Sequence, residues 1–230
     1  MHILAIDTSG TTASAAIMNQ YIILAESSVT LADLRGAGRK THSETLMPMI
    51  DRLFEITDMA VSDMDYIACT CGPGSFTGLR IGAATAKGLA FAADKPLVAV
   101  PTLDAIAYTV TGLAAAGTWV VPMMDARRGQ AYSAFYRMGE DLLLHRMTDY
   151  LAEDIYDLHE MLKAQAPEGS HIIFLGNSDA APRNTYPRAS CVGTRAFEMI
   201  ADGQYKNESE FSLLYIRKPQ AEREREAKLK

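Results

Sequence analysis

The chain has 230 residues, of which 48% are hydrophobic and 22% charged, and its formal net charge is −6. This composition is typical of a globular protein of one large or two small domains, and the acidic charge argues against unaided binding of nucleic acid, because phosphate groups require a basic surface. Three cysteines favour reduced thiols in a cytoplasmic protein over a disulfide framework or zinc site, and no apolar run is long enough for a membrane span.

The first elements predicted are a strand at residues 2–6, a polar turn beginning at Asp7, and a hairpin with strands at 13–18 and 21–27. Because Asp7 interrupts the short apolar start, this segment is typical of a strand rather than of a signal peptide. A basic, glycine-containing loop at 34–40 follows.

A helix is predicted next, over residues 41–55. Thr41 and Glu44 have the spacing of a capping box at its start. Pro48 falls inside it and is expected to kink the helix or to delay its start by one turn. The apolar residues on one face of this helix are Leu46, Met49, Ile50, Leu53 and Phe54.

A strand at 66–71 leads through a glycine-rich turn at 72–74 into a helix predicted over 76–93, with Ser75 as its N-cap. The turn matches neither a P-loop nor a complete Gly-x-Gly-x-x-Gly motif. Its glycine pattern therefore favours a plain tight turn over a phosphate site.

Small residues recur every fourth position of this helix, so that one face is almost free of side chains. Each glycine in a helix interior costs about 1 kcal/mol relative to alanine, so a close neighbour must compensate for this face. The neighbour is either the rest of this chain or another protein, and the glycines do not decide between them. The residues concerned are Gly78, Gly82, Ala86 and Ala90.

After a strand at 97–100 and a helix at 103–114, the pattern begins again. An apolar strand at 119–125 ends in Asp125, as the first strand ends in Asp7, and the later elements predicted are a strand at 130–136, a helix at 153–165, a strand at 171–175 and a helix at 194–202. This order predicts a duplicated α/β unit with mixed sheets flanked by helices. We expect halves at 1–104 and 105–218 that meet at a cleft faced by Asp7 and Asp125, and a charged tail at 219–230.

Five segments together resemble the bacterial TsaB (YeaZ) family, at residues 6–9, 41–46, 72–82, 125–129 and 214–217. The resemblance implies two ribonuclease-H-like halves of the actin-like ATPase superfamily, formerly grouped with glycoproteases. It also implies a role in making the threonylcarbamoyladenosine (t6A) base of tRNA. In this role the chain would be a non-catalytic scaffold for the catalytic paralogue TsaD, joined by the P-loop ATPase TsaE.

One departure from the catalytic paralogue affects the chemistry expected. That paralogue carries a His-x-Glu-Gly-His metal motif, and here Leu46 stands in place of its second histidine after His42 and Glu44. His42 and Glu44 lie on different sides of a helix, and catalytic metal sites usually have three protein ligands. We therefore expect no metal site and no catalytic residue, and interpret Glu44 as a capping residue.

A nucleotide site is the other inference from the resemblance. In actin-like ATPases the turn that matches Asp7, Thr8 and Ser9 wraps phosphate, and its aspartate helps to hold magnesium. The alternative is that Asp7 accepts a local hydrogen bond from its own turn. No tightly bound cofactor is expected, with ATP or ADP and magnesium at a partner interface as the alternative. Arg80, Arg127 and Arg128 could reach a phosphate or a partner carboxylate, and the alternative is that they are exposed arginines that contact only solvent.

The favoured hypothesis is an interaction protein whose helices at 41–55 and 76–92 bind the paralogue. The same surface would form a homodimer when the chain is alone, and tRNA would be reached only through the complex. A bulky residue at position 82 is expected to abolish the complex and leave the fold intact. The competing hypothesis is a stand-alone enzyme of the cleft, either a peptidase or an ATP-dependent transferase. The residues predicted at the interface are Leu46, Met49, Ile50, Leu53, Gly78, Arg80, Gly82 and Ala86.

Overall fold

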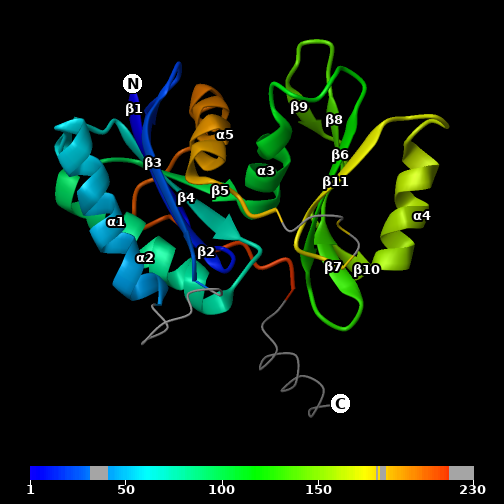
Figure 1. The fold of residues 1–230 in the computed structure, drawn as a ribbon, viewed down its shortest axis with the longest axis horizontal. Helices are drawn as coiled ribbons and strands as arrows, with labels where there is room; N and C mark the ends of the chain where they lie inside the picture. The colour runs from blue at the N-terminus through cyan, green and yellow to red at the C-terminus, as the bar shows by residue number, and fades with distance from the viewer. Residues whose placement is uncertain (32–40, 180, 182–184, 218–230) are drawn as a thin grey trace.

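The structure is a computed structural model, and it describes residues 1–31, 41–179, 181 and 185–217 (Figure 1). The predicted basic loop at 34–40 and the charged tail at 219–230 lie outside the described residues. Two β-sheets form the two halves, with helices packed on them and between them.

The first sheet has the strand order β3-β2-β1-β4-β5. β1 pairs antiparallel with β2 and parallel with β4, so the early hairpin forms one side of the sheet and the later strands form the other. The strands are β1 (His2–Asp7), β2 (Thr12–Asn19), β3 (Ile23–Thr30), β4 (Tyr66–Gly72) and β5 (Leu97–Pro101).

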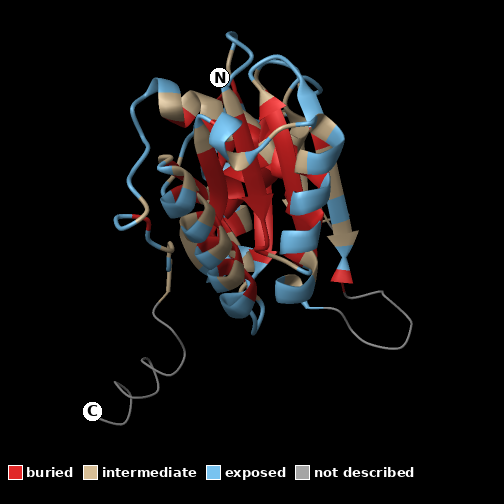
Figure 2. Cartoon of the chain, turned by 90° about the vertical axis from the view of Figure 1, so that its left-hand side faces the viewer, coloured by how far each residue is buried: buried red, intermediate tan, exposed pale blue. Residues whose placement is uncertain are grey.

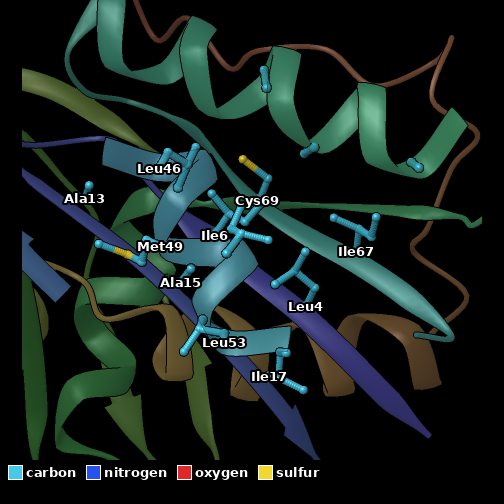
Figure 3. Close-up of a cluster of buried hydrophobic side chains, with 14 of the residues drawn as sticks. Leu4, Ile6, Ala13, Ala15, Ile17, Leu46, Met49, Leu53, Ile67 and Cys69 are labelled. Carbon is cyan, nitrogen blue, oxygen red and sulfur yellow. The ribbon is translucent and has the colours of Figure 1, made fainter. Parts of the chain in front are cut away.

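Helices cover both faces of this sheet because successive strand residues point to opposite sides. Leu4 and Ile6 of β1 pack beneath α1 (His42–Thr57) and α2 (Phe76–Ala93), as Figure 3 shows for the α1 side chains. Ile3 and Ala5 pack on the other face, against α5 (Ala189–Ala201). Figure 2 shows the buried strands behind helices whose outward sides are exposed.

The second sheet is built around β6, which pairs with β7 and β8 along one edge and with β11 along the other. The single strand predicted at 130–136 is divided, because residues 134 and 135 leave the ladder and are buried in the core. The strands are β6 (Trp119–Asp125), β7 (Gln130–Ser133), β8 (Tyr136–Met138), β9 (Leu144–Arg146), β10 (Leu151–Asp154) and β11 (Ile172–Gly176).

Most predicted elements are confirmed, and the errors are local. The helix predicted at 103–114 is α3 (Thr102–Ala107) followed by a 3-10 turn, η3 (Tyr108–Val110), where β-branched residues follow one another. α4 (Ile155–Gln165) covers the outer face of the second sheet. α1 begins at His42, so Pro48 does not delay its start. α5 begins five residues earlier than the helix predicted at 194–202, and β9 and β10 were not predicted.

The end of the chain returns to the first sheet. α5 packs on β1, β2 and β5, and Phe211 is buried in the core beneath α1 and α2. The backbone N–H of Leu214 donates to the carbonyl of Cys71 at 2.7 Å. Part of the range predicted as the second half therefore completes the packing of the first.

The predicted fold class is confirmed, since two mixed sheets flanked by helices are present. Within the described part of the chain, no helix combines the length and apolar character required to cross a bilayer.

Candidate functional site

The turn after β1 is fixed by hydrogen bonds from within the chain. Asp7 Oδ1 accepts from Thr70 Oγ1 at 2.8 Å and from the backbone N–H of Ser9 at 3.1 Å. The Thr8 hydroxyl donates to the carbonyl of Gly78 at 2.8 Å. The local hydrogen bond expected of Asp7 is thus present, and Asp7, Thr8 and Ser9 are all buried.

Three glycines allow α2 and the preceding loop to approach this turn. A Cβ on Gly74 or Gly78 would overlap the backbone oxygen of Ser9 or Thr8, respectively. A Cβ on Gly82 would overlap the hydroxyl of Thr8. Of the two neighbours considered for the smooth face of this helix, the structure therefore places the rest of the chain against Gly78 and Gly82.

Burial changes the acidity of Asp7. Its side chain is 0% exposed, and this desolvation raises its pKa to about 6, although the hydrogen bonds from Ser9 and Thr70 act in the opposite direction. Oδ2 has no hydrogen-bond partner among the described residues. Asp7 lies beneath the turn and is not part of the cleft lining, which does not favour it as a magnesium ligand.

A cleft of about 820 Å³ lies between the two halves. Asp125 lines it, as predicted, whereas Asp7 does not. The Asp125 carboxylate accepts a hydrogen bond from the backbone N–H of Arg127 at 2.7 Å and pairs with the Arg127 guanidinium at 3.3 Å. The polar lining from the first half includes Ser9, Thr11, Thr41, His42, Ser75 and Thr77, and that from the second includes Asp125, Arg127, Tyr132 and Asn177.

Two polar atoms among the cleft-lining residues have no partner within the described structure, Ser9 Oγ and His42 Nε2. A buried polar group without a partner is costly, so such atoms identify where a polar ligand would be accommodated. Within the described ranges, His42 is not part of a group of three or more His, Cys, Asp or Glu residues that could hold a metal ion. Leu46 is 1% exposed and packs in the core.

Glu44 caps α1, as predicted. Its carboxylate accepts hydrogen bonds at 2.8 Å from both the backbone N–H and the hydroxyl of Thr41. This contact stabilises the start of the helix beside the cleft.

The prediction of interface residues requires a correction, because it is wrong to treat most of them as surface anchors. The apolar face of α1 and the smooth face of α2 both pack on the first sheet, so these side chains belong to the core of this chain. Arg80 alone of the set is exposed, and its guanidinium lies 3.6 Å from the ring centre of Phe76. The buried residues are Leu46, Met49, Ile50, Leu53, Gly78, Gly82 and Ala86.

Arg127 and Arg128 both adopt the left-handed region, with φ of 67° and 58°, in the turn between β6 and β7. Both side chains are exposed. Non-glycine residues in this region are uncommon and are found preferentially where the surroundings impose them. The spacing of the sequence does not predict this conformation.

The described structure resembles known proteins over nearly its full length. Two solved structures from Pseudomonas aeruginosa share the fold: an uncharacterized protein with similarity to peptidase YeaZ, with a TM-score of 0.78, and YeaZ, with a TM-score of 0.75. Each is 23% identical and covers 94% of this chain and 99% of its own. At this identity the similarity establishes the fold alone.

Sequence comparison identifies the family. The family model described as "TsaD: tRNA N6-adenosine threonylcarbamoyltransferase" matches residues 37–203. The tRNA threonylcarbamoyladenosine biosynthesis protein TsaB of Bacillus subtilis is 33% identical over 217 residues, which is 93% of this chain and 86% of that protein. The TsaB protein of Escherichia coli is 33% identical over 63% of this chain and 59% of its own length. With this fold and this extent of identity, the chain belongs to the TsaB family.

Proposed function

We propose that this chain acts in the synthesis of the t6A base of tRNA, as a non-catalytic partner of a TsaD-like paralogue. The observation that carries the proposal is the 33% identity with Bacillus subtilis TsaB over 93% of the chain. A TsaE-like ATPase would join the pair, and tRNA would be bound only through the complex. In the absence of the paralogue, the surface that binds it would form a homodimer of this chain.

The lack of a catalytic metal is supported by the position of Leu46. Its side chain points from α1 into the core of the first half, between α1 and the sheet. A histidine at this position would have to lie among apolar side chains, where an unpaired polar group is costly. The metal-dependent chemistry is therefore assigned to the paralogue.

The partner surface is revised to the outward faces of α1 and α2. On α2, Arg80, Ala84, Gly88 and Phe91 are exposed at helical spacing, and Phe91 is 76% exposed. A Cβ on Gly88 would meet nothing within 4 Å, so packing inside this chain does not require a glycine there. α1 contributes Met47, which is 44% exposed. Ala84 and Gly88 are small and lie between the larger Arg80 and Phe91, which would allow a partner helix to approach α2 closely.

Gly88 provides a test that separates binding from folding. Gly88→Arg should fold normally but weaken binding to a co-expressed TsaD-like paralogue by more than about tenfold, because the side chain occupies the proposed contact. Binding is measured by co-purification and calorimetry, and folding by circular dichroism. Ala164→Arg, which adds the same charge to an exposed position of α4, is the matched control and should bind as the unmodified chain does. Full binding by Gly88→Arg would exclude this surface.

The cleft supports a second candidate, a stand-alone nucleotide-binding or hydrolytic enzyme, because two of its lining residues, Ser9 and His42, each carry a buried polar atom without a partner among the described residues. Of the predicted nucleotide residues Asp7, Thr8 and Ser9, only Ser9 lines the cleft. Under the partner proposal, nucleotide with magnesium would bind at the interface with the paralogue rather than to the isolated chain.

Calorimetry with magnesium-ATP distinguishes the two candidates. We expect the isolated chain to show no saturable binding at micromolar concentrations, and Ser9→Ala to behave in the same way. Tight binding that is lost in Ser9→Ala would favour the enzyme and would count against the partner proposal. The Ala164→Arg variant serves again as the control for nonspecific charge effects.

A further inference from the structure

A buried carboxylate joins elements from both halves of the chain. Asp104 of α3 is 3% exposed, and its Oδ1 accepts hydrogen bonds from the hydroxyls of Tyr136 at 2.6 Å and Tyr150 at 2.7 Å. Its Oδ2 accepts from Nε of Arg195 at 2.9 Å. Arg195 also pairs with Glu198 at 3.0 Å, and Glu198 accepts a hydrogen bond from the hydroxyl of Tyr108. We refer to these six residues as the Asp104 cluster.

The donors to Asp104 come from opposite sides of the molecule. Tyr136 lies on β8 of the second sheet, and Tyr150 immediately precedes β10 of the same sheet. Arg195 lies on α5, which packs on the first sheet. α3 itself lies between the two, since Ala105 packs with the first half and Leu103 with the second. The Asp104 carboxylate thus accepts hydrogen bonds from residues of both halves.

The hydrogen bonds to Asp104 are strong because their acceptor is a buried carboxylate. Burial and the nearby Asp104 carboxylate raise the pKa of Tyr136 and Tyr150 well above the ordinary value, so both phenols keep their protons and remain donors. Hydrogen bonds to an ionised, buried acceptor are stronger than those between neutral groups. Separating the second sheet from α3 would leave Asp104 without two of its three side-chain donors, which is costly for a buried charge.

A second connection crosses between the halves near the end of the described chain. Phe211 is buried in the first half, and Leu214 is hydrogen-bonded to Cys71 of β4. Three residues later, Nη2 of Arg217 donates to the carbonyl of Ala152 on β10 at 2.7 Å. This segment therefore contacts both halves, at a place remote in sequence from Asp104.

We propose that the Asp104 cluster is a conformational lock that holds the two halves, and hence the cleft between them, in one relative orientation. Proteins made of two lobes around a cleft commonly close on their ligands by a hinge motion. Here a change of the angle between the halves would break the hydrogen bonds that Tyr136 and Tyr150 donate to Asp104. The cleft is therefore held at one opening before any ligand or partner binds, whichever function the cleft serves.

The test measures the distance between the halves directly. Spin labels are attached at Ala60→Cys in the first half and Ala164→Cys on α4, both exposed positions, with Cys191→Ser to remove the most accessible native thiol. The parent should give one narrow distance distribution. Tyr136→Phe with Tyr150→Phe should add a second population, because each hydroxyl removed raises the fraction of the unlocked state on the order of tenfold.

Tyr156→Phe is the control, since it removes a hydroxyl from an exposed position of α4, outside the Asp104 cluster. It should leave the distribution narrow. The single variant Tyr150→Phe, at a half-buried position, is measured as well, so that a misfolded double variant does not prevent a decision. A distribution unchanged by Tyr150→Phe and by the double variant, or broadened equally by Tyr156→Phe, would overturn the proposal.

Discussion

Replacing Gly82 by valine should lower the free energy of unfolding by more than about 3 kcal/mol, enough to unfold a protein of ordinary stability. The added Cβ would overlap the Thr8 hydroxyl and lie 3.4 Å from Sγ of Cys69. Thr8 cannot move aside without losing its hydrogen bond to the carbonyl of Gly78. Because both neighbours are buried, the strain cannot be relieved toward solvent. Loss of complex formation in this variant would therefore follow from loss of the fold.

Gly88→Ala, at an exposed position of the same helix, is the matched comparison. Nothing lies within 4 Å of the position of its Cβ, so the variant should be more stable than the unmodified chain by about 0.5–1 kcal/mol. Urea denaturation followed by circular dichroism measures both variants. A Gly82→Val variant with an unchanged denaturation midpoint would show that α2 does not pack on Thr8 as described. Gly78→Val, which meets the backbone oxygen of Thr8, provides a second substitution at the same contact.

The contrast between Gly82 and Gly88 shows what the sequence could predict. The four-residue spacing identified a smooth helix face, and the bounds of α2 agree with the predicted 76–93. A periodic pattern shows which face of a helix is covered, but not whether the cover is its own sheet or another protein. The interface residues were misplaced for this reason, since an apolar stripe satisfies both descriptions.

Long-range contacts were the other part that the sequence could not supply. The partners of Asp104 lie 32, 46 and 91 residues away, so no local spacing connects them. The return of α5 to the first sheet is similar, because a helix pattern does not specify which sheet it covers. β9 has only three residues and β10 four, which is too short for a clear alternation of apolar and polar positions. The N-caps of α1 and α2 were predicted correctly, since their contacts are local.

Asp7→Asn should make the chain more stable at pH 8 while leaving its stability at pH 4 nearly unchanged. In the folded chain the pKa of Asp7 is raised from 3.8 to about 6 by burial, so the native state binds its proton more tightly than the unfolded chain does. Stability therefore falls as the pH rises from about 4 to about 6, and the full loss is present above that range. A pKa difference of this size corresponds to about 3 kcal/mol, which sets the upper limit of the expected gain.

The asparagine keeps an oxygen that can accept the hydrogen bonds from Thr70 and Ser9 but carries no charge. The difference in urea midpoint between Asp7→Asn and the unmodified chain should be near zero at pH 4 and should increase in favour of the variant up to pH 8. The exposed control Asp51→Asn should follow the unmodified chain. Parallel curves for Asp7→Asn and the unmodified chain would contradict the burial of an ionised Asp7.

Adding magnesium distinguishes a structural role of Asp7 from a role as a metal ligand. If Asp7 held the ion, magnesium at pH 8 would raise the urea midpoint of the unmodified chain but not that of Asp7→Asn. Because the carboxylate is enclosed beneath the turn, we expect magnesium to change the midpoint of neither protein.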